Sequence, residues 1–227
     1  MRRVAPCAPV LTLGGVNRFS TYLFDLDGTL LDTIDLISYC YRRTLETHRG
    51  VTYPDSTWLE KLGMPLQKQL EVFSSDQAEI DAMRATYRGF FLERHDAMVR
   101  EYPGAREAVG KLKDRGVKLG VVTSKMRPGT LRGLTAGGFD GVFDVLVTVE
   151  DVAEHKPHPA PVTRALELLD SRPEEALFIG DSPHDMASGR AAGVSTAAAL
   201  WGPFPRQALE PHAPTFWLAE PGEMALV

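Results

Sequence analysis

Two patterns of hydrophobic residues alternate along much of the chain. Short apolar runs, of the kind that form buried parallel strands, occupy residues 20–25, 117–124, 144–149, 176–182 and 195–201. Segments with apolar residues at helical intervals predict helices at about 105–115, 128–136, 159–170 and 184–192. Strands that alternate with helices predict an α/β fold, here a Rossmann-like parallel sheet with helices on both faces.

Residues 33–101 interrupt this alternation, because one helical pattern follows another without an intervening strand. Ile34, Ile37 and Tyr41 fall on one face of a helix, and residues 77–99 carry apolar side chains at helical intervals. We therefore expect an inserted helical subdomain at 33–101, joined to a core by short hinges. The predicted core comprises residues 19–32 and 102–227.

The two ends of the chain have less regular patterns. Arginines, prolines and glycines interrupt the apolar residues of 1–18, which predicts a flexible tail rather than an export signal. Residues 201–216 are rich in proline, so we expect irregular structure there, followed by a short edge strand and a terminal helix. No apolar stretch in the sequence approaches the roughly 20 residues of a membrane span.

Composition narrows the class of protein. The chain has 227 residues, of which 44% are hydrophobic and 24% charged, as is typical of globular proteins. A net charge of -5 gives no basic surface, so we expect neither a nucleic acid nor a membrane as partner. Cys7 and Cys40 have the spacing of neither a metal site nor a disulfide framework, which favours a reducing, cytoplasmic location.

Polar residues follow the predicted strands at the points where the strands end. Ligands of open α/β sheets bind outside the carboxyl ends of the strands, so these side chains should meet at one edge. They are Asp25, Asp27, Thr123, Ser124, Lys125, Glu150, Asp151, Lys156, Asp181 and Asp185. Carboxylates directly after a buried strand are costly to desolvate without a partner, and these residue types together suit a metal-assisted reaction of phosphate.

Four short motifs occur in a fixed order along the chain, namely DLDGT (25–29), VVTS (121–124), KP (156–157) and GDSPHD (180–185). On these motifs, residues 20–227 resemble a haloacid dehalogenase superfamily phosphatase with a helical cap inserted after the first motif. The resemblance implies that the helical subdomain at 33–101 is this cap.

The resemblance also implies the chemistry of individual residues. Asp25 is expected to attack phosphorus and to form an aspartyl phosphate. Asp27 is expected to protonate the leaving oxygen and then to activate water; dehalogenases and phosphonate-cleaving relatives lack an aspartate there. Lys156 would offset the negative charge of Asp25 and phosphate, and Thr123 would hydrogen-bond a phosphate oxygen.

Mg²⁺ is the implied cofactor, because a carboxylate and a phosphate repel each other unless a cation lies between them. The expected ligands are Asp25, the main-chain carbonyl of Asp27, and Asp181. Asp185 would be a direct or water-mediated ligand. The sequence therefore predicts a magnesium site built on the first and last motifs.

Residues from both subdomains are expected to contact the substrate. Gly28 leaves the backbone free to turn and to present its amide, and Ser124 stands where many relatives have asparagine. Related capped phosphatases place the glycine of a cap loop over the active site. By this resemblance we expect Gly63 and Leu66 to contact substrate, with Lys61 as an anion contact.

A small phosphorylated metabolite is the expected partner, since a closing cap leaves little room for a macromolecule. The LLDT opening resembles phosphoglycolate phosphatases, whereas KLGMPL and RHDAMVREYPGA are closer to the pyrophosphatase branch of that group. An ester and pyrophosphate both stay open, as do a sugar phosphomutase and a phosphate-sensing protein without turnover. Oligomeric state is also open, as a monomer or a homodimer.

Overall fold

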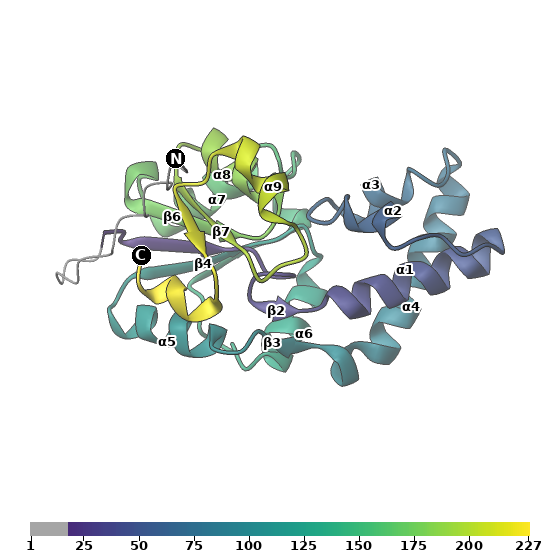
Figure 1. Ribbon diagram of the computed structural model, residues 1–227, viewed down its shortest axis with the longest axis horizontal. Coiled ribbons are helices and arrows are strands. Elements are labelled where there is room, and N and C mark those ends of the chain that lie inside the picture. Colours follow the sequence, from purple (N-terminus) through teal and green to yellow (C-terminus); the bar gives the residue numbers. More distant parts are fainter. Residues whose placement is uncertain (1–17) are drawn as a thin grey trace, which may run out of the picture.

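The computed structural model describes residues 18–227 and shows a parallel sheet with helices on both faces and a group of helices to one side (Figure 1). Within this range the main sheet has six strands in the order β5-β4-β1-β6-β7-β8, with parallel neighbours. They are β1 (Thr21–Phe24), β4 (Lys118–Val122), β5 (Val145–Val147), β6 (Ala176–Gly180), β7 (Ser195–Ala199) and β8 (Phe216–Leu218). The predicted α/β fold is confirmed.

Strand β1 lies inside the sheet, and its register aligns the strand ends. Phe24 pairs with Val121 of β4 and with Ile179 of β6. All four residues of β1 are completely buried, as expected for a parallel strand that is covered on both faces. The residues that follow β1, β4 and β6 therefore emerge at the same edge of the sheet.

Side chains of β1 alternate between two apolar layers. Tyr22 and Phe24 belong to one cluster with Val109 of α5, whereas Leu23 belongs to another with Val162 of α7. The helices of the core are α5 (Ala105–Asp114), α6 (Arg127–Ala136), α7 (Ala160–Leu169) and α8 (Pro183–Ala191). Period-two alternation along the strand thus explains why helices cover both faces.

The helical segment between the first two core strands contains four helices. They are α1 (Ile34–Arg49), α2 (Ser56–Leu59), α3 (Leu66–Leu70) and α4 (Gln77–Met98). Tyr41 of α1 stacks on Trp58 of α2, with ring centroids 5.7 Å apart, and meets Tyr87 of α4 edge-on at 5.0 Å. These rings give the segment an aromatic core of its own.

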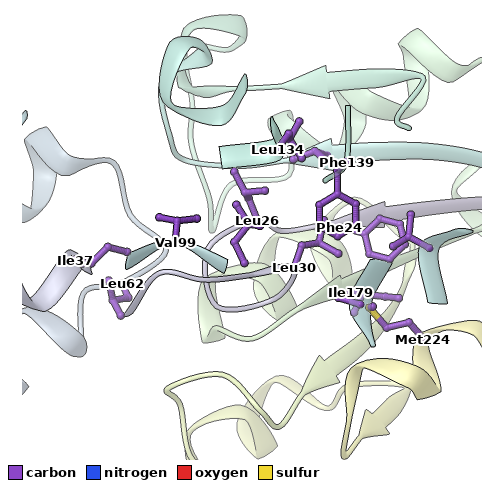
Figure 2. Packing of buried hydrophobic residues seen from close by; sticks show 14 of the residues in the cluster. Phe24, Leu26, Leu30, Ile37, Leu62, Val99, Leu134, Phe139, Ile179 and Met224 are labelled. Carbon is purple, nitrogen blue, oxygen red and sulfur yellow. The ribbon is translucent and has the colours of Figure 1, made fainter. Parts of the chain in front are cut away.

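The chain enters and leaves the helical segment at adjacent points. Strands β2 (Leu31–Asp32) and β3 (Arg100–Glu101) form a short antiparallel ladder in which Leu31 pairs with Glu101. Apolar packing is continuous across this junction, from Phe24, Leu26 and Leu30 on the core side to Ile37, Leu62 and Val99 (Figure 2). The expected hinge regions are therefore paired with each other.

The end of the chain differs from its prediction in two places. A short helix, α9 (Arg206–Leu209), and a 3-10 turn, η3 (Glu210–His212), lie within the region expected to be irregular. The expected terminal helix is a 3-10 helix, η4 (Pro221–Ala225). Proline is tolerated in a first helical turn, which is where it lies in η3 and η4.

Two further 3-10 turns lie in loops of the core, namely η1 (Val149–Asp151) and η2 (Pro173–Glu175). The expected tail, residues 1–18, lies outside the described residues except for Arg18. Among the helices of residues 18–227, none has the length and hydropathy needed to cross a membrane.

Candidate active site

Lys156 joins two of the predicted site carboxylates. Its Nζ donates to Asp25 Oδ1 at 2.7 Å and to Asp185 Oδ1 at 2.6 Å. It also donates to the carbonyl oxygen of Val122, at the end of β4, at 3.2 Å. All three charged side chains are buried, and the lysine replaces part of the hydration that each carboxylate loses.

The pKa values of Asp25 and Lys156 are both shifted from their usual values. Desolvation raises the pKa of Asp25 to about 7, although the nearby Lys156 ammonium opposes the shift. Burial alone would lower the pKa of Lys156, but Asp185 and Asp25 together hold it above its usual value. Lys156 is thus charged at neutral pH, whereas full ionisation of Asp25 requires a further cation nearby.

Asp181 lies beside this pair and forms no salt bridge with any of residues 18–227. Its Oδ1 accepts a hydrogen bond from Thr29 Oγ1 at 2.8 Å. Desolvation and the charges of Asp25 and Asp185 raise its pKa well above the usual value. Gly28 permits this placement, because it has a φ of +91° and a Cβ there would lie 2.6 Å from Asp181 Oδ2.

Asp25, Asp181 and Asp185 form a group that suits a divalent cation. One carboxylate oxygen of each lies within 4.8 Å of the others, and all three residues are buried. Lys156 contacts two of these carboxylates, Asp25 and Asp185, and in the described part of the chain no ammonium contacts the third, Asp181. Mg²⁺ prefers carboxylate oxygens as ligands, so the residues present fit the cation that the sequence predicts.

Helix α8 begins with a capping box that orients Asp185. The hydroxyl and the N–H of Ser182 donate to Asp185 Oδ2 at 2.6 Å and 3.0 Å. Asp185 N–H donates back to Ser182 Oγ at 3.2 Å. Asp185 Oδ2 accepts two hydrogen bonds, whereas Oδ1 accepts only the one from Lys156. Oδ1 therefore keeps a lone pair for a cation or a water.

The Asp27 carboxylate lies outside this acidic group. Its Oδ1 accepts from Thr33 Oγ1 at 2.8 Å and from Lys125 Nζ at 2.6 Å. The same Lys125 ammonium lies 4.9 Å from the ring centroid of Phe91 on α4. Asp27 is therefore held by one hydroxyl and by a lysine that also contacts the helical segment.

A cavity of about 550 Å³ lies beside these residues, between the core and the helical segment. The predicted site residues that line it are Asp25, Asp27, Thr123, Ser124, Asp181, Gly63 and Leu66. Ser124 Oγ donates to the carbonyl oxygen of Gly63 at 2.5 Å. The loop before α3 thus rests directly on the core at the edge of the cavity.

The structure changes some of the predicted contacts and adds others. The Gly28 N–H donates to the carbonyl of Leu31 at 2.9 Å, so it is not presented to a substrate as the sequence analysis expects. Lys61 is not among the residues that line the cavity. Sequence analysis gave no role to Thr33 or Lys125, although Lys125 directly follows the VVTS motif at the predicted binding edge.

Comparison with known proteins agrees with this arrangement. The family of haloacid dehalogenase-like hydrolases matches residues 22–199. The pyrophosphatase PpaX of Bacillus cereus is 43% identical over 202 residues, which cover 88% of this chain and 92% of that protein. A haloacid dehalogenase-like hydrolase from Bacteroides fragilis has a similar structure, with a TM-score of 0.85, 28% identity, and coverage of 91% of this chain and 99% of the other. The chain therefore belongs to the haloacid dehalogenase-like hydrolases and is a phosphatase of that family.

Proposed function

We propose that this phosphatase depends on Mg²⁺ and hydrolyses a small phosphorylated metabolite, such as phosphoglycolate, through an aspartyl phosphate on Asp25. The observation that carries the proposal is the buried group of three carboxylates and one lysine beside a cavity of about 550 Å³. Such a group is costly to bury for structural reasons alone, because its negative charge exceeds its positive charge.

Asp25 is the proposed nucleophile. One of its carboxylate oxygens bonds to phosphorus as the bond from phosphorus to the leaving oxygen breaks. Lys156, 2.7 Å from Asp25 Oδ1, fixes the carboxylate and offsets the charge that the phosphate brings. The Thr123 hydroxyl accepts the Lys125 N–H at 3.2 Å, which leaves its own proton available for a phosphate oxygen.

Asp27 is the proposed acid and base. When protonated, it gives its proton to the leaving oxygen. When ionised, it takes a proton from the water that attacks phosphorus, so that the bond from phosphorus to Asp25 breaks and inorganic phosphate is released. Thr33 and Lys125 hold the Asp27 carboxylate in one orientation during both steps.

Asp25, Asp181, Asp185 and the main-chain carbonyl of Asp27 are the proposed holders of Mg²⁺. The bound cation would offset the charge of the phosphate and polarise its oxygens. The raised pKa values of Asp25 and Asp181 support this assignment, because both carboxylates are desolvated and the protein supplies a contacting ammonium to Asp25 only.

Pyrophosphate is the second candidate substrate, since relatives that are 43% identical bear the name pyrophosphatase. The apolar side chains of the cavity wall favour an organic phosphate over it. A phosphate sensor fits less well, because the chain keeps the nucleophile and the acid–base residue. A phosphomutase would need both residues too, and it would show transfer between sugar-phosphate positions rather than release of phosphate. The cytoplasmic location, the lack of a nucleic-acid partner, and a monomeric or homodimeric state remain predictions.

Phosphate release tests the proposal. We would measure it at neutral pH with Mg²⁺ or EDTA on phosphoglycolate, pyrophosphate and sugar phosphates, for the wild type, Asp25→Asn and Asp140→Asn. Asp140 is a matched control, because it accepts a threonine hydroxyl, as Asp181 does, but on the exposed surface. Release that needs Mg²⁺ and Asp25 but not Asp140 supports the proposal, whereas metal-independent release, or equal loss in both variants, contradicts it.

A further inference from the structure

The cavity extends well beyond the carboxylates, and its remaining walls are largely apolar. Leu66 and Ile37 line it from α3 and α1, Tyr87 and Phe91 from α4, and Met126 from the start of α6. A volume of about 550 Å³ is in the range of pockets that hold whole organic ligands and far exceeds the space that a phosphate group needs. The rest of the space is therefore available to the group that leaves with the bridging oxygen.

Several polar atoms among these walls have partners within the protein, although the Tyr87 hydroxyl has no hydrogen bond to any of residues 18–227. Tyr41 donates its hydroxyl proton to Gln69 Oε1 at 2.8 Å, and Gln69 Nε2 donates to the carbonyl of Met64 at 2.8 Å. A leaving group in the cavity finds few free hydroxyl or amide groups on this side. The wall thus favours hydrocarbon over a polyhydroxylated chain.

The arginines that line the cavity give little support for a second anion. Arg84 pairs with Asp81 at 2.7 Å, and Arg132 pairs with Asp96 at 2.9 Å. Arg88 has no carboxylate within 4.0 Å among residues 18–227, but it is exposed at the mouth. A second phosphate or a carboxylate would lose hydration in the cavity, and the only arginine there without a carboxylate partner among residues 18–227, Arg88, is itself exposed to water.

Two exposed hydrophobic side chains mark the mouth of the cavity. Leu92 of α4 and Met126 are 56% and 39% exposed, and both line the cavity. A ligand that reaches the mouth would cover them. The contact of Ser124 with the Gly63 carbonyl closes the neighbouring edge, so this apolar space persists with the loop seated on the core.

We propose that the substrate is a phosphate monoester whose carbon skeleton is apolar and uncharged. This inference rests on the proposed phosphatase activity, keeps its mechanism, and replaces phosphoglycolate as the example substrate. The phosphate lies against Asp25, and the skeleton extends along Phe91 and Leu66 toward Leu92 and Met126. Pyrophosphate and phosphoglycolate would be poorer substrates, because they place charge where the wall offers hydrocarbon.

A series of alkyl phosphates tests this inference, because the leaving alcohols of ethyl, butyl and hexyl phosphate differ in length but little in acidity. Full burial of a methylene is worth about 0.8 kcal/mol, or roughly fourfold, and partial burial about twofold. We therefore expect kcat/KM to rise on the order of tenfold from ethyl to hexyl phosphate. Hexyl phosphate should also exceed phosphoglycolate and pyrophosphate.

Variants at the mouth separate this site from a general preference for apolar compounds. Leu92→Gln should reduce the rise in kcat/KM with chain length, because it replaces hydrocarbon at the mouth with an amide. Leu131→Gln is the matched control, since Leu131 is 49% exposed on α6 but does not line the cavity. Arg88→Gln should have little effect on any alkyl phosphate.

The outcomes distinguish the two levels of the proposal. If phosphate release depends on Asp25 but is equal along the alkyl series, the apolar site is refuted and the phosphatase assignment stands. The apolar site is also refuted if pyrophosphate or phosphoglycolate is a better substrate than the alkyl phosphates and Arg88→Gln greatly lowers kcat/KM for that substrate alone. Failure of every compound to release phosphate in an Asp25-dependent manner refutes the phosphatase proposal and this inference with it.

Discussion

Lys125 Nζ lies 2.6 Å from Asp27 Oδ1 and 2.9 Å from Asp27 Oδ2, so one ammonium contacts both oxygens of the proposed acid–base carboxylate. The two side chains are only 13% and 20% exposed, which strengthens their interaction relative to a surface pair. Lys125 also faces the Phe91 ring of α4. The position of the helical segment and the orientation of Asp27 therefore share one side chain.

Lys125→Met should impair proton transfer more than phosphate binding. A positioned general acid accelerates proton transfer steps by at least about a hundredfold. A disoriented Asp27 should therefore lower the rate on the order of tenfold or more. The loss in kcat/KM, which covers the steps up to release of the leaving group, should be large for alkyl phosphates, whose leaving oxygens need a proton. It should be under about threefold for p-nitrophenyl phosphate, whose leaving group needs none.

Two comparisons separate positioning from structural damage. Lys125→Arg should recover part of the activity on alkyl phosphates, because it keeps a cation beside Asp27. Lys113→Met should leave kcat unchanged, since Lys113 contacts main-chain carbonyls on the surface of the core. Equal losses for both classes of leaving group in Lys125→Met would show that Lys125 does not act through Asp27.

Asp181→Asn should stabilise the metal-free protein and abolish its response to Mg²⁺. The substitution removes one buried negative charge that lacks a salt bridge, which we expect to raise the free energy of unfolding by about 1–3 kcal/mol in EDTA. Thermal unfolding with and without Mg²⁺ measures both effects. In Asp140→Asn the Mg²⁺ response should persist, and a full response in Asp181→Asn would argue against Asp181 as a ligand.

Gly63→Ala should distort the loop that rests on the core. Gly63 has a φ of +92°, and a Cβ there would lie 2.8 Å from Ser182 Oγ, beside Asp185. Gly50→Ala is the control, because Gly50 has a φ of +66° but nothing within 4 Å of its Cβ position. Both variants should lose about 1–2 kcal/mol of stability from the backbone alone.

Activity distinguishes these two glycines. Gly63→Ala should lower kcat/KM by about tenfold or more, as expected for misplaced groups at a reacting centre, and Gly50→Ala should leave it unchanged. Steady-state assays beside urea unfolding give both quantities. Unchanged activity in Gly63→Ala would mean that the loop moves without consequence for the site.

His95 should make the protein less stable in weak acid. Burial lowers its pKa below 6.5, the nearby Lys125 and Arg132 lower it further, and the hydrogen bond to Asp96 opposes the shift. The unfolded chain therefore binds a proton more readily, so stability is lost as the pH falls through 6.5. The slope contributed by one histidine is at most about 1.4 kcal/mol per pH unit.

Urea unfolding of wild type and His95→Gln between about pH 7.5 and pH 5.5 measures this contribution as a difference in slope, since the lowered pKa of His184 and the raised pKa of Asp25 affect both proteins. His95→Gln should remove the contribution of His95 to the slope. His48→Gln should leave the slope unchanged, since His48 is only partly buried and hydrogen-bonds Thr86 within the same helical segment. An identical slope in wild type and His95→Gln would exclude His95 as its source.

The sequence predicted the edge of the sheet where the chemistry lies, because parallel strands bring their carboxyl ends together whatever the intervening loops do. Strand periodicity alone predicts that this edge holds Asp25, Thr123 and Asp181. The positions of individual hydrogen bonds could not be predicted, since they depend on side-chain directions. The Gly28 amide, which bonds Leu31 instead of facing the cavity, is one example.

The parts that sequence analysis missed are contacts between distant segments. Lys125 was visible at the end of a strand, but only the structure shows that it reaches Asp27, 98 residues away. The apolar cavity wall was likewise unpredictable, because helical periodicity cannot show whether an apolar side chain such as Phe91 packs inside the segment or lines the cavity.

The β2–β3 ladder brings the two ends of the inserted helices together at Leu31 and Glu101. A segment whose ends meet can be lengthened, shortened or exchanged without altering the spacing of the strands on either side. The proposed hydrolytic residues lie on those strands and their loops, whereas much of the apolar wall lies on the insertion. Substitution of the single continuous stretch of gene that encodes the inserted helices can therefore change the substrate while the reaction in the core is retained.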